Sequence, residues 1–264
     1  MHFGATLRML RVDAGFSLRA LAESVGVSSA YLSRVENGHD APPTPDRLVA
    51  IANALGVAPV ALVGLADRVS PVVSDYLARV PAAGALFVEI ARRELTTAQL
   101  ARVQAFVEKE FPVRERAAPA EPRIGPLVAR GGVVSEMTCS QLDDVLDIAA
   151  VRLARATRSA VATLSKALRQ REQEASTAIG AGVSVPHAIV QGVEPAAVLV
   201  TLRRPLAVAT PDGLPLRVCI GVVHPPEHGR LLSLLAHVAG LAREQFVEHL
   251  CAARDPRRAL ALLE

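Results

Sequence analysis

Hydrophobic positions in the first 65 residues recur every three or four residues, which is the spacing of one helix face. Ser17 is placed to cap a helix whose apolar stripe consists of Leu18, Leu21, Ala22 and Val25. Gly26 ends that helix, and Ser28 can cap the next one, which continues to Glu36 before Asn37-Gly38. Two helices joined by a short turn with glycine are typical of a helix-turn-helix unit.

Helical spacing continues in residues 67–112, where Pro71 and Pro81 mark breaks. Thr96 or Thr97 can cap a helix whose apolar stripe consists of Leu100, Val103, Phe106 and Val107. An earlier apolar set can complete a helical hairpin with this stripe, namely Leu77, Leu86, Phe87 and Ile90. Two interpretations stay open for this region: an extension packed on the first domain, or a dimerisation element.

The chain changes character after Phe111. The stretch PVRERAAPAEPRIGP is polar and rich in Pro and Ala, which predicts a linker. From Ile124 onward, helical spacing recurs in five segments: 142–149, 161–168, 230–242, 244–253 and 256–264. Two apolar runs typical of strands, 196–202 and 216–223, lie among them. Helices alternating with strands predict an α/β fold around a sheet.

These patterns predict a multidomain protein without internal repeats. We place an all-α helix-turn-helix domain at 1–66, a helical extension at 67–116, a linker at 117–124 and the α/β domain at 125–264. A chain of 264 residues is long enough for two compact domains, and 51% hydrophobic residues are enough to form their cores.

The charge is too weak for non-specific binding to nucleic acid. The net charge is +3, and within residues 1–65 five arginines are balanced by five carboxylates. Any DNA binding therefore depends on local geometry and on a homodimer that doubles the contacts. A protein-interaction unit that never meets DNA stays open as the other interpretation of this domain.

The sequence lacks the signatures of several other classes. Its three cysteines are far apart and without CxxC spacing, which argues against a disulfide framework and a zinc site. We find no P-loop, and we expect neither a metal nor a cofactor. No signal peptide and no apolar run long enough for a membrane span are evident, so we expect a cytoplasmic protein with no membrane partner.

The stretches SLRALAESVGVSSAYLSRVENG and TPDRLVAIANALGVAP resemble the Xre/Cro family of helix-turn-helix domains. The resemblance implies that the third helix enters the major groove of a double-stranded DNA operator. By position, Ser28, Ser29 and Ala30 would face base edges. Arg34 would lie one turn further along this helix, and arginine is the side chain best suited to bind guanine through two hydrogen bonds. Asn37 would contact phosphate.

Two further positions follow from this resemblance. Glu36 would repel phosphate unless it were paired, and the resemblance pairs it with Arg11 in a structural ion pair. Leu18 stands where the family commonly has a glutamine that holds phosphate. This difference predicts weaker DNA binding.

A second set of chemically active residues lies between Arg171 and His187. Gly180 and Gly182 permit close approach of the backbone, and Pro186 fixes the chain immediately before the imidazole of His187. A neutral imidazole is nucleophilic near pH 7 and can carry a phosphoryl group. From the residues alone, a histidine packed in the core is the competing interpretation.

The stretch LRQREQEASTAIGAGVSVPHAIVQGV resembles the phosphoacceptor motif of enzyme IIA of the bacterial phosphotransferase system, fructose/mannitol/nitrogen type. The resemblance implies a central mixed sheet flanked by helices. It implies that His187 accepts phosphate from HPr or an HPr-like donor of the nitrogen branch, with Arg171 balancing the charge. It also places Thr177 near the ring and makes His228 a second histidine that hydrogen-bonds the phosphoryl group.

The two resemblances together indicate a transcriptional regulator whose enzyme IIA-like domain is phosphorylated at His187. Two alternatives stay open: a phosphocarrier that passes phosphate to a separate IIB partner, and a regulator whose IIA-like domain is only an interaction platform.

Overall fold

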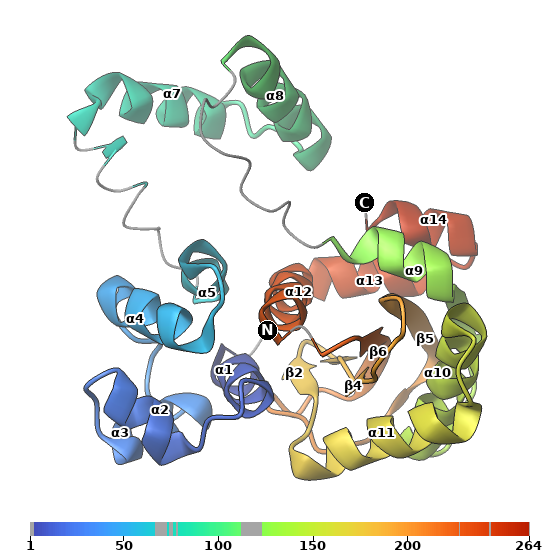
Figure 1. Cartoon of the computed structure of the whole chain (residues 1–264). Coiled ribbons are helices and arrows are strands. Elements are labelled where there is room, and N and C mark those ends of the chain that lie inside the picture. The colour runs from blue at the N-terminus through green and yellow to red at the C-terminus, as the bar shows by residue number, and fades with distance from the viewer. Residues whose placement is uncertain are drawn as a thin grey trace. The chain divides into compact units, whose positions relative to one another are not determined.

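The structure is a computed structural model that describes residues 3–66, 73, 76–77, 79–111, 123–226, 228–242 and 244–263, without the side chains of 81, 97, 228, 229 and 244 (Figure 1). Contacts divide the chain into two units. One consists of residues 1–68 together with 122–264, and the other of residues 69–121. Of the predicted linker, 117–124, only the last two residues are among those described. Pro71, one of the two predicted breaks, lies outside the described residues.

The first unit begins with five short helices: α1 (Phe3–Asp13), α2 (Leu18–Ser24), α3 (Ser29–Glu36), α4 (Pro45–Leu55) and α5 (Pro59–Leu65). Both predicted caps are confirmed. The Ser17 hydroxyl accepts the Ala20 N–H at 3.1 Å, and the Ser28 hydroxyl accepts the Tyr31 N–H at 3.1 Å. Gly26 has a φ of +69°, a conformation that glycine adopts without strain, and it lets the chain turn between α2 and α3.

A mixed sheet forms the centre of the second half of this unit. Its strands are β1 (Val133–Met137), β2 (Ala178–Gly180), β3 (Val183–Ser184), β4 (His187–Ile189), β5 (Ala196–Leu206) and β6 (Leu216–His224). The order is β1-β5-β6-β3-β2, and β4 also pairs with β6. The β5–β6 pair is antiparallel, whereas β1–β5, β3–β6 and β4–β6 are parallel. The predicted mixed sheet and its two long strands are confirmed.

Helices cover both faces of this sheet: α9 (Ile124–Gly131), α10 (Leu142–Thr157), α11 (Val161–Glu174), α12 (His228–Leu241), α13 (Glu244–Ala252) and α14 (Pro256–Ala261) (Figure 1). Because side chains alternate along a strand, β5 serves two cores. Val198 and Val200 pack in the core with α10 and α11, whereas Ala197 and Leu199 pack in the core with α9 and α12. The five helices predicted for this domain are confirmed.

The helix-turn-helix region and the α/β region share a continuous hydrophobic core within the first unit. Helices α1 and α5 both pack against α12, and α1 also contacts β2. A Cβ on Gly240 of α12 would lie 4.0 Å from Leu65 Cδ2 of α5, an ordinary van der Waals distance, so α5 packs directly on α12 at this position. The boundary between the two regions is therefore an apolar interface rather than a solvated gap.

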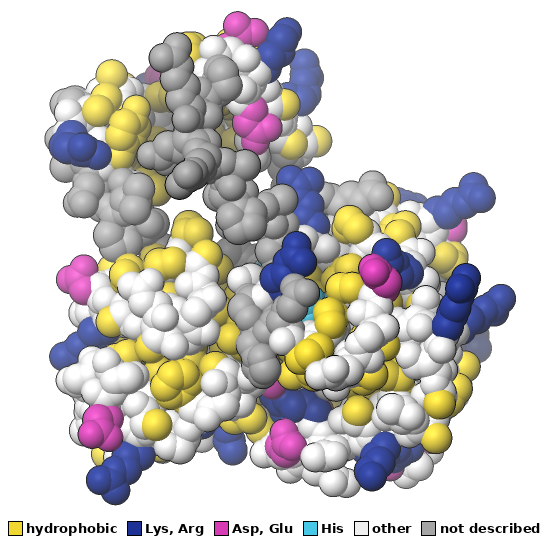
Figure 2. All heavy atoms as spheres, in the orientation of Figure 1, with side chains coloured by type: hydrophobic (Ala, Val, Ile, Leu, Met, Phe, Trp, Pro, Cys, Tyr) yellow, Lys and Arg dark blue, Asp and Glu magenta, His cyan; other side chains and the backbone are white. Residues whose placement is uncertain are grey.

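The second unit contains α7 (Pro81–Arg92) and α8 (Thr97–Glu110). Thr96 caps α8 in a capping box with Gln99, which confirms one of the two predicted caps. Hydrophobic side chains lie on the surface of this unit (Figure 2), and all described side chains of α8 are exposed. Among the described residues, no helix combines the length and the apolar character that a membrane span requires.

Candidate functional site

His187 begins β4 and is buried, with 1% of its surface exposed. Its Nδ1 lies 2.8 Å from the Val185 carbonyl oxygen. Because that oxygen only accepts hydrogen bonds, the Nδ1 atom carries the proton. Val185 is itself held in place because its N–H donates to the Thr177 carbonyl at 3.0 Å. The local fold therefore fixes the ring and directs Nε2 away from the strand.

Arg171 brings a positive charge to the same imidazole. It lies in the last turn of α11, and its Nη1 donates to the Ala175 carbonyl at 2.8 Å. Its Nε lies 3.1 Å from His187 Nε2, and only 8% of its surface is exposed. A fixed guanidinium beside the ring nitrogen is suited to balance an oxyanion bound there. The structure thus brings together two of the predicted site residues.

Asp13, the last residue of α1, completes this cluster and was not among the residues predicted from the sequence. Its Oδ1 lies 2.8 Å from His187 Nε2 and 2.6 Å from Arg171 Nε. Its Oδ2 accepts a hydrogen bond from Arg171 Nη2 at 3.1 Å. Burial opposes ionisation of this carboxyl, but the hydrogen bonds and charges of His187 and Arg171 outweigh it and hold the pKa of Asp13 below its usual value.

The position of Asp13 in the sequence carries one weak signal. A carboxylate in the last turn of a helix is unfavourable with the helix dipole unless a cation compensates it. In α1 the cation comes from Arg171, 158 residues further along the chain. Only the tertiary fold identifies that partner.

The structure places the other predicted residues of this site as follows. The Thr177 hydroxyl donates to Glu172 Oε2 at 2.5 Å rather than to the ring, so Thr177 supports His187 through its main chain. His228 begins α12, and its side chain lies outside the described part of the chain. His224, which was not predicted as a site residue, is also buried, and its Nδ1 donates to the Pro225 carbonyl at 2.8 Å.

Residues predicted to meet DNA lie on or beside α3. Ser28, Ser29 and Ala30 are exposed at its N-terminal end. The Arg34 side chain is 63% exposed and forms an ion pair with Asp40 at 2.7 Å, which raises the pKa of Arg34 and lowers that of Asp40. Asn37 is exposed, and its Nδ2 donates to the Ser33 carbonyl at 2.8 Å.

Glu36 does not face the predicted DNA surface, because it is buried and paired with Arg11. The Arg11 side chain also donates to the Phe16 carbonyl at 2.8 Å, which ties the turn after α1 to the end of α3. The predicted structural ion pair is confirmed.

Comparison with protein families defines the class of each half. The model of the helix-turn-helix domain family matches residues 2–64. The model described as phosphoenolpyruvate-dependent sugar phosphotransferase system, EIIA 2, matches residues 128–264. Because this match covers more than half of the chain, the chain belongs to that family and carries a helix-turn-helix domain in front of it.

This chain is also similar to solved structures. The nitrogen regulatory protein IIA-Ntr from Neisseria meningitidis is 25% identical, with a TM-score of 0.51, over 53% of this chain and 99% of that chain. IIA mannitol from Escherichia coli is 19% identical, with a TM-score of 0.43, over 51% of this chain and 96% of that chain. The search of curated proteins gave no match.

Proposed function

We propose that this protein is a DNA-binding transcriptional regulator whose EIIA domain is phosphorylated on His187 by the phosphotransferase system. The observation that carries the proposal is the geometry of that histidine inside an EIIA domain. Its Nδ1 is held by a carbonyl, and its Nε2 lies 3.1 Å from a buried arginine. The fusion of such a domain to a helix-turn-helix domain favours regulation over transport.

The proposed chemistry is a phosphoryl transfer between proteins. With the proton on Nδ1, the lone pair of His187 Nε2 attacks the phosphorus of a phosphorylated donor, HPr or an HPr-like protein of the nitrogen branch. A bond forms between Nε2 and phosphorus, the bond from phosphorus to the donor breaks, and the donor atom keeps the electron pair. Arg171 would then pair with the new phosphoryl oxygens.

The proposed DNA surface is the exposed end of α3. Ser28, Ser29 and Ala30 would face base edges, and Arg34 would exchange its exposed partner Asp40 for a base. An exposed ion pair is weak, so this exchange costs little. Glu36 is buried with Arg11 and therefore does not repel the phosphate backbone.

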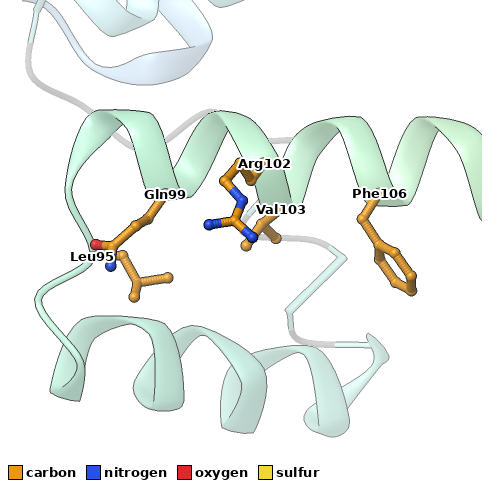
Figure 3. A pocket seen from close by; sticks show the side chains of 5 residues that line it. All are labelled: Leu95, Gln99, Arg102, Val103 and Phe106. Carbon is orange, nitrogen blue, oxygen red and sulfur yellow. The ribbon is translucent and has the colours of Figure 1, made fainter.

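We propose a homodimer formed through α7 and α8. A cluster of large apolar side chains is exposed on this hairpin: Leu86, Phe87, Val88, Leu100, Val103, Phe106, Val107 and Phe111. A hollow on the side of α8 that faces α7 is lined by Leu95, Gln99, Arg102, Val103 and Phe106 (Figure 3). Two helices cannot bury these side chains by themselves, and a second copy of the same hairpin supplies a matching face.

Phosphotransfer tests the proposal. The purified full chain is incubated with phosphoenolpyruvate, enzyme I and HPr, or with the nitrogen-branch pair, and acid-labile phosphate is located by mass spectrometry. We expect phosphate on His187 and none on the His187→Ala variant. A lack of labelling with both donor pairs would overturn the phosphoacceptor role. Onward transfer to a separate IIB protein without retention on DNA would instead identify a phosphocarrier.

A further inference from the structure

We infer that Asp13 occupies the phosphoacceptor site as an internal substitute for phosphate, so that docking of the helix-turn-helix domain and phosphorylation of His187 exclude each other. This inference rests on the proposed function of His187. It adds a regulatory contact that joins the two domains at the reacting nitrogen.

The carboxylate takes the hydrogen-bonding positions that a phosphoryl group would need. Oδ1 of Asp13 lies 2.8 Å from His187 Nε2, the nitrogen with the free lone pair in the neutral ring. The same oxygen lies 2.6 Å from Arg171 Nε, and Oδ2 lies 3.1 Å from Arg171 Nη2. Asp13 and a phosphoryl group are both anions, and they cannot fill this space together.

Docking also closes off the reacting nitrogen. Nδ1 is 2.8 Å from the Val185 carbonyl oxygen, and Nε2 lies between the Asp13 carboxylate at 2.8 Å and Arg171 Nε at 3.1 Å. A donor phosphoryl group must approach Nε2 in line with its lone pair, and these two side chains occupy that approach. The docked state therefore covers His187, which is 1% exposed, and blocks its nucleophilic nitrogen.

Phosphorylation would in turn expel Asp13. A phosphohistidine carries nearly two negative charges, and it would sit against a carboxylate that is 4% exposed. Asp13 would lose Nε2 as a partner and would compete with the phosphoryl oxygens for Arg171. An unpaired buried charge is strongly destabilising, so the stable outcome is separation of α1 from the EIIA site.

Helix α1 connects this site to the DNA-facing helix. Asp13 and Arg11 both lie in its last turn, and Arg11 holds Glu36, the final residue of α3, through two hydrogen bonds. A groove beside the site is lined by Asn37 together with Ala209 and Pro211 of the EIIA domain. Release of α1 would therefore move α3 and open the surroundings of Asn37.

The Asp13→Asn variant of the full chain tests this inference, because it keeps the size of the side chain and removes its charge. The matched control is Glu23→Gln, which makes the same chemical change at an exposed position on α2. The initial rate of His187 phosphorylation is measured with phosphoenolpyruvate and whichever donor pair labels the wild-type chain: enzyme I with HPr, or the nitrogen-branch pair. If His187 reacts only while Asp13 is undocked, the observed rate is the intrinsic rate multiplied by the undocked fraction. We expect Asp13→Asn to react about tenfold faster than wild type, and Glu23→Gln to react at the wild-type rate.

Small-angle X-ray scattering of the wild-type chain supplies a readout that does not depend on the variant folding. We expect the radius of gyration to increase after phosphorylation, relative to a sample treated without phosphoenolpyruvate. Equal rates for all three proteins, or an unchanged radius in a fully phosphorylated sample, would overturn the inference and leave the phosphoacceptor role intact. If no protein is labelled at all, the proposed function fails and the inference fails with it.

Discussion

Arg11 and Glu36, which are 25 residues apart in the chain, form a buried ion pair with two hydrogen bonds. Arg11 Nε lies 2.6 Å from Glu36 Oε1, and Nη2 lies 2.8 Å from Oε2. Only 10% and 4% of the two side chains are exposed. The pair joins the C-terminal ends of α1 and α3 and so fixes the orientation of the proposed DNA-reading helix.

We predict that Glu36→Ala strongly destabilises the protein. The substitution leaves the Arg11 charge buried without its partner, and loss of one member of a buried pair costs about 3–5 kcal/mol. Urea unfolding of the full chain, followed by circular dichroism, measures the effect. Asp40→Asn is the matched control, because Asp40 pairs with Arg34 at the exposed surface, and we expect it to change the unfolding curve little. Similar losses in both variants would contradict the structural role of the buried pair.

We predict that Arg34→Ala weakens binding to the specific DNA site and relaxes its sequence preference. Loss of one bidentate contact to guanine costs about ten- to a hundredfold in discrimination. The measurement is a titration of the chain against its preferred duplex and against single-base variants of it. Arg203→Ala removes the same charge from an exposed position on β5 and should leave the preference unchanged. An unaltered preference in Arg34→Ala would contradict base reading by this residue.

The exposed apolar hairpin predicts a dimer that a single charge disrupts. Phe106→Glu places a carboxylate in the apolar cluster of α8, where Phe106 is 59% exposed in the single chain. Sedimentation velocity should show a dimer for wild type and a monomer for Phe106→Glu. Ala105→Glu adds the same charge on another side of α8 and should remain dimeric. A wild-type monomer at micromolar concentration would contradict the proposal.

Cys219 should be inert in the folded protein. Burial raises the pKa of its thiol from 9.0 to about 12, so the reactive thiolate does not form near neutral pH. We expect iodoacetamide at pH 8 to leave Cys219 unmodified until the chain is unfolded, as read by mass spectrometry. Because the folded pKa is the higher one, the thiol also makes stability decrease as the pH rises from about 9 toward 12. Rapid modification of Cys219 in the native chain would contradict its burial.

Local signals in the sequence were enough for most of the helices. Ser17, Ser28 and Thr96 each begin a helix because a hydroxyl satisfies a free backbone N–H, and this pattern can be recognised without the fold. The two long strands were also predictable, since 196–202 and 216–223 are continuous apolar runs.

The short strands could not be predicted in the same way. β2, β3 and β4 have only two or three residues each, which is too short for an alternating pattern, and their pairing depends on β6 and on the turn at Ala181 and Gly182. Strand β1, which pairs with β5, has five residues. Four of them are half-buried, so its sequence shows no alternation of buried and exposed positions that would predict a strand.

The candidate site was predictable only in part. Arg171 and His187 lie close together in the structure, as expected from the motif that contains both. Asp13 comes from the other domain, 174 residues before His187, and no local rule connects them. The hydroxyl of Thr177 is bound by Glu172, a neighbour whose role depends on the turn after α11.

The affinity of the full chain for DNA, before and after phosphorylation, tests the central claim most directly. A duplex selected by the chain from a random pool is titrated with the unphosphorylated protein and with protein carrying phosphate on His187. The account predicts a change in dissociation constant of about fivefold or more, the usual range of coupling between two sites. His187→Ala treated identically should show no change. Equal affinity of the two wild-type forms would contradict a regulator controlled by phosphorylation.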